Sequence, residues 1–170
     1  MSTVAPRGFT LIEVAITLVV LGVLISLGLP SFTTWINNTK IRTAAESMLN
    51  GVQLARAEAV RQNQTMVFIL GASGNWTVQT QAGSVIQQRP ANEGSSNTTL
   101  TITPSGATEI TFNGLGRVIA NGDASASISS ITVGSTILSS SQARNMTINI
   151  GLGSVRMCDP LVSQPDPRAC

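Results

Sequence analysis

A single carboxylate lies inside the most apolar part of this chain. Glu13 follows Gly8 by five positions, and from Phe9 to Leu29 the other side chains are almost all aliphatic, small or singly hydroxylated. A helix of about 20 residues, rising roughly 1.5 Å per residue, crosses the hydrocarbon core of a bilayer. A carboxylate in such a helix costs on the order of 2 to 3 kcal/mol on insertion scales, so Glu13 indicates a specific partner.

The remaining polar residues offer little for catalysis. The sequence has no histidine, and its single lysine, Lys40, closely follows the apolar run. The carboxylates beyond the helix are scattered singly, and Gly114-x-Gly116 and Gly151-x-Gly153 lack the strand-to-helix context of phosphate-binding loops. Two cysteines without histidine cannot complete a structural zinc shell. We therefore expect no enzymatic activity, no cofactor and no metal site.

The segment around Glu13 resembles a known processing site. Residues 8–14 read Gly-Phe-Thr-Leu-Ile-Glu-Val, similar to the prepilin cleavage site of type IV pilins and pseudopilins, with a short basic leader before them. The resemblance implies a leader at residues 1–8, cleavage between Gly8 and Phe9, N-methylation of Phe9 and a role for Glu13 in subunit assembly. It also places Pro30 where such pilins carry a helix-kinking proline.

Two ordinary interpretations of the same segment remain as alternatives. A secretory signal peptide has a shorter apolar stretch followed by a small-x-small cleavage site, to which Ser26-Leu27-Gly28 is only a loose match. An uncleaved signal anchor explains the length of the run and a cytoplasmic Arg7, but not Glu13 beside Phe9. We interpret residues 9–30 as a helix that spans the bacterial inner membrane once and later lies in a fibre core.

Beyond Pro30 the apolar pattern becomes that of an amphipathic helix. Apolar and small side chains recur at steps of three and four, at Ile41, Ala45, Met48, Val52, Ala55 and Ala59. The pattern predicts one long helix from Phe9 to about Asn63. Because proline lacks an N–H and crowds the preceding turn, we expect this helix to bend near Pro30.

After Asn63 the pattern changes to the alternation typical of strands. Nine short segments are rich in β-branched residues and bounded by Gly, Ser, Asn or Pro. They are Thr65–Leu70, Trp76–Gln81, Val85–Gln88, Thr98–Thr103, Glu109–Phe112, Gly116–Ile119, Ile131–Val133, Asn145–Ile150 and Ser154–Cys158. We predict an α+β fold in which an antiparallel meander lies on the amphipathic half of the helix. Residues 31–170 would form one periplasmic globular domain, which suits a charged fraction of only 11%.

Cys158 and Cys170 are the only cysteines and predict a disulfide bond. In an oxidising compartment such a pair is usually bridged, and the cross-link would contribute about 3 kcal/mol in the chain-entropy model. Trp76 is assigned to the core of the domain. The alternative for the cysteines is two free thiols in a frayed C-terminal segment.

Three segments of the globular part resemble a narrower family. Leu54–Val60, Ile110–Arg117 and Gly151–Cys158 are together similar to the GspH/FimT group of minor pilins and pseudopilins. This resemblance implies a minor type IV pilin that joins a priming or tip complex, or alternatively a minor pseudopilin of type II secretion. Implied partners are other minor and major pilins or pseudopilins, the prepilin peptidase, the inner-membrane assembly platform and inner-membrane lipid. The mature chain would end in a pilus or pseudopilus fibre.

A third function, capture of double-stranded DNA, follows from a partial motif. Some FimT-type proteins resemble one another in a Gly-Arg-x-Arg motif, but Gly153 to Arg156 reads Gly-Ser-Val-Arg, so serine replaces the first arginine. Arg156, Arg168 and Arg144 are the candidate contacts to phosphates. A net charge of only +2 predicts weak, salt-sensitive binding at most. The simpler interpretation of Arg156 is a solvated strand residue.

Overall fold

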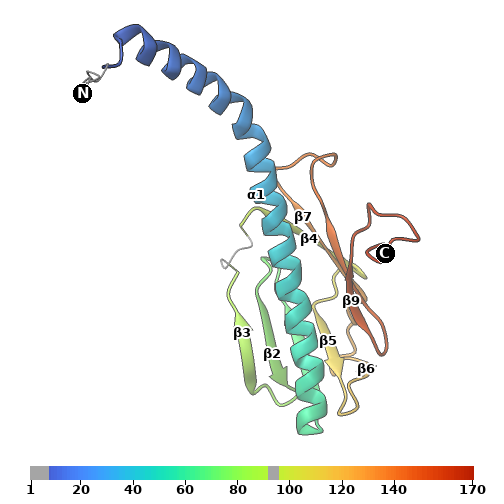
Figure 1. Cartoon of the computed structure of the whole chain (residues 1–170). Coiled ribbons are helices and arrows are strands. Elements are labelled where there is room, and N and C mark those ends of the chain that lie inside the picture. The colour runs from blue at the N-terminus through green and yellow to red at the C-terminus, as the bar shows by residue number, and fades with distance from the viewer. Residues whose placement is uncertain (1–7, 92–95) are drawn as a thin grey trace, which may run out of the picture. The chain divides into compact units, whose positions relative to one another are not determined.

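The computed structural model describes residues 8–91 and 96–170, apart from the side chains of residues 27–30. In this part of the chain one helix is followed by nine strands, which confirms the α+β class (Figure 1). They are α1 (Leu11–Gln62), β1 (Met66–Leu70), β2 (Trp76–Thr80), β3 (Val85–Arg89), β4 (Thr98–Thr103), β5 (Glu109–Phe112), β6 (Val118–Ile119), β7 (Ser130–Ser135), β8 (Met146–Ile150) and β9 (Val155–Cys158). The chain divides into two compact units, Met1–Trp35 and Ile36–Cys170.

The single long helix expected from the sequence is confirmed. Local interactions explain where it begins and where it ends. The Thr10 hydroxyl accepts a hydrogen bond from the Glu13 backbone N–H at 3.3 Å, as an N-terminal cap does. At the other end Asn63 adopts a left-handed backbone with φ of 49°, a conformation that commonly ends helices. The helix continues through position 30. The kink predicted at Pro30 concerns a side chain outside those described and stays a prediction.

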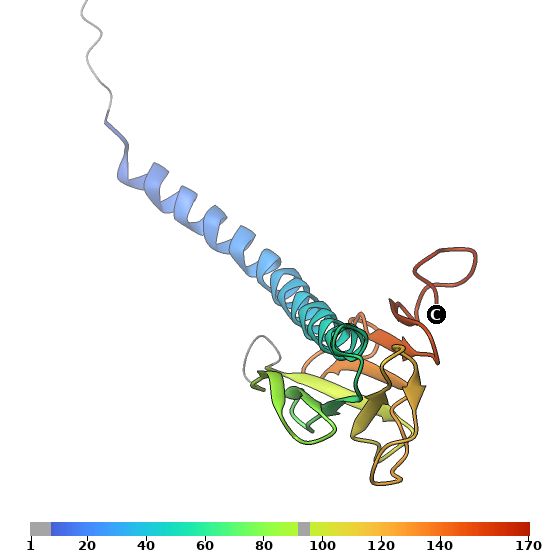
Figure 2. The ribbon, with the colours of Figure 1, turned by 90° about the horizontal axis from the view of Figure 1, so that it is seen from below.

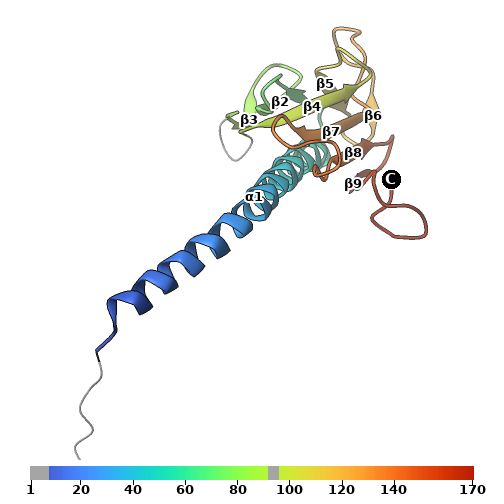
Figure 3. The ribbon, with the colours of Figure 1, turned by 90° about the horizontal axis from the view of Figure 1, so that it is seen from above.

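The strands form two antiparallel sheets, so the prediction of one meander is wrong. The first sheet has the order β3-β2-β1-β5-β6 and the second the order β4-β7-β8-β9. After β3 the chain crosses to the second sheet, where β4 pairs with β7. It then returns to the first sheet, where β5 pairs with β1 on the side opposite β2. Figure 2 and Figure 3 show the two sheets from opposite sides. An alternating pattern indicates which face of a strand is buried, but it does not identify the neighbouring strand.

All nine predicted strands are present, and β6 is shorter than predicted for a clear structural reason. Strand β6 is limited to Val118–Ile119 because residues 113–117 form a tight turn. The Asn113 side chain oxygen accepts hydrogen bonds from the backbone N–H groups of Leu115 and Arg117, at 3.1 and 3.0 Å. Gly116 lies in the left-handed region with φ of 71°, so the turn uses the freedom of glycine at this position.

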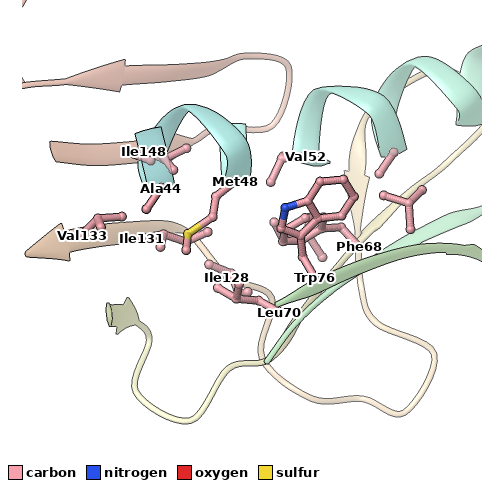
Figure 4. Close-up of a cluster of buried hydrophobic side chains, with 14 of the residues drawn as sticks. Ala44, Met48, Val52, Phe68, Leu70, Trp76, Ile128, Ile131, Val133 and Ile148 are labelled. Carbon is pink, nitrogen blue, oxygen red and sulfur yellow. The ribbon is translucent and has the colours of Figure 1, made fainter. Parts of the chain in front are cut away.

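The core lies in the Ile36–Cys170 unit, between the C-terminal part of α1 and both sheets. The predicted helical stripe of Ile41, Ala45, Met48, Val52, Ala55 and Ala59 is fully buried, as expected. Figure 4 shows Ala44, Met48 and Val52 of α1 together with Ile131 and Val133 of β7, Phe68 of β1 and Trp76 of β2. Each large apolar side chain buried there contributes about 1.5 to 3 kcal/mol.

Trp76 is a core residue, as its sequence context predicted. It is 5% exposed, its ring centroid lies 6.1 Å from that of Phe68, and its indole N–H donates to the Ser47 hydroxyl at 3.1 Å. A Cβ added at Gly51 of α1 would lie 2.8 Å from the Phe68 ring and 2.9 Å from the Trp76 ring. The helix therefore approaches the first sheet so closely that position 51 has no room for a side chain.

Candidate assembly site

The N-terminal part of α1 exposes apolar side chains on all sides. From Phe9 to Ile25 the large apolar residues are between 48% and 89% exposed. This part of the helix is long and apolar enough to cross a membrane. Exposure of so many large apolar side chains to water is unfavourable by about 25 cal/mol per Å² of apolar surface. The segment is therefore suited to lipid or to other helices rather than to water.

The hydroxyl groups of Thr17 and Ser26 donate hydrogen bonds within the helix. The Thr17 hydroxyl donates to the carbonyl of Val14 and the Ser26 hydroxyl donates to the carbonyl of Val23, each at 2.8 Å. Such bonds to a carbonyl of the preceding turn remove the need for water or for a partner chain. The hydroxyls are thus compatible with an apolar environment.

Glu13 is the exception on this surface. It lies in the first turn of α1, where the positive end of the helix dipole favours a negative charge. Within residues 8–91 and 96–170 its carboxylate has no hydrogen-bonding or ionic partner, although its backbone N–H bonds to Thr10. A carboxylate moved into apolar surroundings without a cation is strongly disfavoured. The arrangement can therefore select a partner that supplies a positive charge at this level of the helix.

Gly8 and Phe9, the predicted cleavage pair, are both exposed and precede the helix. Residues 1–7, with Arg7 of the predicted leader, lie outside the described residues. A Cβ added at Gly8 would meet nothing within 4 Å. Nothing in the described structure thus requires glycine at position 8.

The predicted disulfide is confirmed. Cys158 at the end of β9 is bonded to Cys170, with their Cα atoms 5.0 Å apart. Inside the closed loop the Asp159 backbone N–H donates to the Arg168 carbonyl at 2.7 Å. The Arg168 guanidinium lies 2.8 Å from the Asp166 carboxylate and, with the Arg168 backbone N–H, lowers the pKa of Asp166 to about 2. The loop is therefore held by internal contacts as well as by its cross-link.

The three arginines predicted as DNA contacts do not gather at one place. Arg168 pairs with Asp166, and the Arg156 guanidinium donates to the Cys170 carbonyl at 3.0 Å, so both lie at the disulfide loop. Arg144 precedes the start of β8, whereas Arg156 pairs with Asn149 near the end of that strand. Five strand residues span roughly 17 Å. Arg144 is thus separated from the other two, and DNA binding stays a prediction.

The three segments that carry the family resemblance meet in space at the C-terminal end of α1. The Arg56 guanidinium donates to the Gly116 carbonyl at 3.0 Å, and the Val118 backbone N–H donates to the Leu152 carbonyl at 3.4 Å. Val155 of β9 lines a cavity of about 520 Å³ together with the helix residues Gln53, Arg56, Ala57, Val60 and Arg61. The segments that carry the resemblance thus lie together where the end of the helix, the turn before β6 and the turn before β9 come close to one another.

Comparison with known proteins agrees with this architecture. The family described as Type II transport protein GspH matches residues 44–153, and the prokaryotic N-terminal methylation motif matches residues 5–29. Pilin-like protein PilA1 of Thermus thermophilus is 41% identical over 71 residues, which are 40% of this chain and 44% of that protein. The chain thus spans less than half the length of this relative.

A solved structure shares the fold. The type IV minor pilin FimU of Pseudomonas aeruginosa superposes with a TM-score of 0.50 at 17% sequence identity, covering 70% of this chain and 88% of that one. At this identity the likeness concerns the fold alone. Since the GspH match covers more than half of the sequence, the chain belongs to the GspH family of minor type IV pilins and pseudopilins and carries the N-terminal methylation motif.

Proposed function

We propose that this chain is made as a prepilin, cut between Gly8 and Phe9, methylated at Phe9 and assembled into the priming or tip complex of a type IV pilus. The observation that carries the proposal is the exposed apolar segment Phe9–Ile25 with the carboxylate of Glu13 in the first turn of α1. Such a surface suits two successive environments, a bilayer before assembly and a bundle of helices after it.

Glu13 has a mechanism in this proposal. Cleavage creates a charged amine at Phe9, and the Glu13 carboxylate of one subunit pairs with that amine on its neighbour. Because neither charge is tolerated alone in an apolar bundle, the pair sets the axial register as each subunit leaves the bilayer. The other pilins, the prepilin peptidase and the inner-membrane assembly platform are the proposed partners, and the domain from residue 31 onward faces the periplasm until assembly.

Processing is tested by mass spectrometry of the protein extracted from membranes. The expected chain begins at an N-methylated Phe9. An intact Met1 or a cut near Gly28 would end the prepilin interpretation. Substitution of Gly8 by a bulky residue should block cleavage without changing the fold, because a side chain at this position meets nothing within 4 Å.

Assembly is tested by fractionation of Glu13→Ala cells. The variant should insert into the membrane and be processed normally, yet be depleted from sheared fibres, because the lost interaction lies between subunits. Glu46→Ala is the matched control, since Glu46 lies on the same helix and pairs with Arg42 of its own chain at 2.8 Å. Equal recovery of the Glu13 variant and wild type in fibres would show that Glu13 is dispensable.

The second candidate is a minor pseudopilin of type II secretion, which the description of the matched family favours. It uses the same helix and the same charge in a different machine. Deletion of the gene distinguishes the two: loss of surface pili with normal protein secretion supports the pilus, and loss of secreted proteins with normal pili supports the pseudopilus.

A further inference from the structure

The aromatic residues of the chain fall into a buried and an exposed group. Phe68, Phe112 and Trp76 are between 0% and 5% exposed in the core, whereas Phe32 is 57% exposed and Trp35 is 63% exposed on α1. Phe32 and Trp35 stack on each other one helical turn apart, with ring centroids 5.9 Å apart and planes inclined by 28°. Two large aromatic rings thus form one exposed surface on the Met1–Trp35 unit.

The position of this pair along the helix corresponds to a particular depth in a membrane. The apolar run from Phe9 to Leu29 has about the length that crosses the hydrocarbon core. Phe32 and Trp35 follow Leu29 by three and six residues, so in an upright helix they lie about 4.5 and 9 Å beyond the end of the run. The headgroup layer on each side of a bilayer is roughly 5 to 7 Å thick. The Cα atom of Phe32 therefore lies within the headgroup layer and that of Trp35 about 2 Å beyond it. Because side chains on a helix point back toward its N-terminus, the Trp35 ring returns toward that layer.

We propose that Phe32 and Trp35 form an interfacial anchor that binds the headgroup and glycerol region of phospholipids and fixes the depth of the helix in the bilayer before assembly. Aromatic side chains, tryptophan above all, concentrate at this level of membranes because the ring is apolar while the surroundings are partly hydrated. The exposed Phe9, at the opposite end of the apolar run, lies near the other interface. The inference rests on the membrane-spanning stage of the proposed function.

The residues next to Phe32 and Trp35 indicate that lipid, rather than another protein chain, contacts the two rings. The apolar run ends immediately before it, and polar residues Thr33 and Thr34 lie between the two rings in the sequence. A mixed surface of this kind fits the boundary between acyl chains and water better than it fits the dry interior of a helix bundle. Packing against the helix of a second copy is the competing occupant, and the experiment separates the two.

The test measures Trp35 fluorescence in the full chain, reconstituted in phosphatidylcholine vesicles whose acyl chains carry bromine either near the headgroup or near the chain end. The Trp35 signal is the difference between wild type and Trp35→Phe, which leaves only the buried Trp76. We expect bromine near the headgroup to quench this signal about twofold more than bromine near the chain end. Trp76 in the Trp35→Phe protein should be quenched by neither lipid.

Three results would overturn the anchor. Stronger quenching by the deep bromine would place the pair in the hydrocarbon, and quenching by aqueous iodide alone would place it in water. Insensitivity to both lipids, together with quenching by iodide that rises as the protein is diluted in lipid, would show that a second copy covers the pair. Extraction of the same vesicles with alkaline carbonate tests the span separately: release of the chain refutes the membrane-spanning stage, whereas retention without shallow quenching refutes the anchor only.

Discussion

Asn38 Oδ1 accepts a hydrogen bond from the Arg144 backbone N–H at 2.8 Å, which joins α1 to a loop 106 positions later in the chain. The same side chain donates from Nδ2 to the Gln142 carbonyl at 3.0 Å. Both ends of one amide group thus hold the loop before β8 against the helix. Because the loop backbone receives a donor and an acceptor from a single rigid group, its position relative to α1 is closely defined.

Asn38→Ala should release this loop. We expect the free energy of local unfolding of this loop to fall by about 1 to 2 kcal/mol, since two hydrogen bonds are lost. Amide hydrogen exchange of Arg144 in the full chain measures the effect and should accelerate. Asn38→Asp keeps the acceptor for Arg144 but loses the donor to Gln142, so the Arg144 amide should stay protected in that variant. Equal exchange in wild type and Asn38→Ala would contradict the role of this side chain.

Gly116→Ala should destabilise the globular unit. Gly116 has a φ of 71°, and an added Cβ would lie 2.9 Å from a methyl group of Val60. A left-handed alanine costs about 1 to 2 kcal/mol, and displacement of Val60 adds to that loss. The control is Gly153→Ala, because a Cβ at Gly153 meets nothing within 4 Å. Urea unfolding compares the variants, and similar stabilities for both would refute the predicted crowding.

Cys158→Ser and Cys170→Ser should destabilise the protein equally, because each removes the same cross-link. The expected loss is about 2 to 4 kcal/mol. Counting of reactive thiols in the unreduced, denatured protein establishes whether the bond forms in the cell. Two reactive thiols per chain, or unequal losses in the two variants, would contradict the prediction.

The Asp166–Arg168 pair predicts a change at acidic pH. The pKa of Asp166 is lowered from 3.8 to about 2, first by the Arg168 guanidinium and then by the Arg168 backbone N–H. A carboxyl group with a lowered pKa stabilises the folded state above its ordinary pKa, and this contribution is lost as the pH falls through the lowered value. Arg168→Gln should raise the pKa of Asp166 part of the way, since the backbone N–H remains.

Carboxyl NMR titration measures this pKa directly. In urea unfolding, the difference in stability between wild type and Arg168→Gln should shrink as the pH is lowered from about 4 toward about 2. Asp123→Asn is a useful control, because it removes a carboxyl group at another site and should leave the Asp166 titration unchanged. An unaltered Asp166 pKa in Arg168→Gln would show that the ion pair does not form in solution.

The unit from Ile36 onward should not bind duplex DNA in a salt-dependent manner at micromolar concentration. The Arg168 guanidinium is paired with Asp166, the Arg156 guanidinium is bonded to the Cys170 carbonyl, and two arginines supply few phosphate contacts. Binding to duplexes of unrelated sequence at low and physiological salt provides the test. Submicromolar, salt-sensitive binding that Arg156→Ala abolishes would overturn this expectation and revive the DNA-capture function.

The sequence predicted the elements whose signals are local. The buried helical stripe repeats at three- and four-residue steps within one segment, so Met48 and Val52 could be assigned to the core before any partner was known. The Cys158–Cys170 bond followed from the presence of a single pair. The prominence of Glu13 also needed no tertiary information, because a carboxylate in an apolar run stands out in the sequence alone.

The features that the sequence did not reveal depend on distant contacts or on position. The place of β4 in the second sheet depends on its pairing with β7, and the alternation of apolar and polar side chains along a strand does not specify that partner. The bond between Asn38 and Arg144 has no periodic signal. Phe32 and Trp35 lie between the apolar run and the amphipathic stripe and belong to neither pattern, although aromatic residues just beyond an apolar run are themselves a signal of a membrane interface.

The internally bonded hydroxyls of Thr17 and Ser26 have a consequence for partitioning. When the proposed subunit passes from lipid into a helix bundle, these groups exchange no hydrogen bonds, and the aliphatic side chains pass between two media of similar polarity. Apart from the contribution of the Glu13 carboxylate, the free energy of transfer of the segment is then close to zero. The direction of transfer therefore depends on where Glu13 finds its counter-charge.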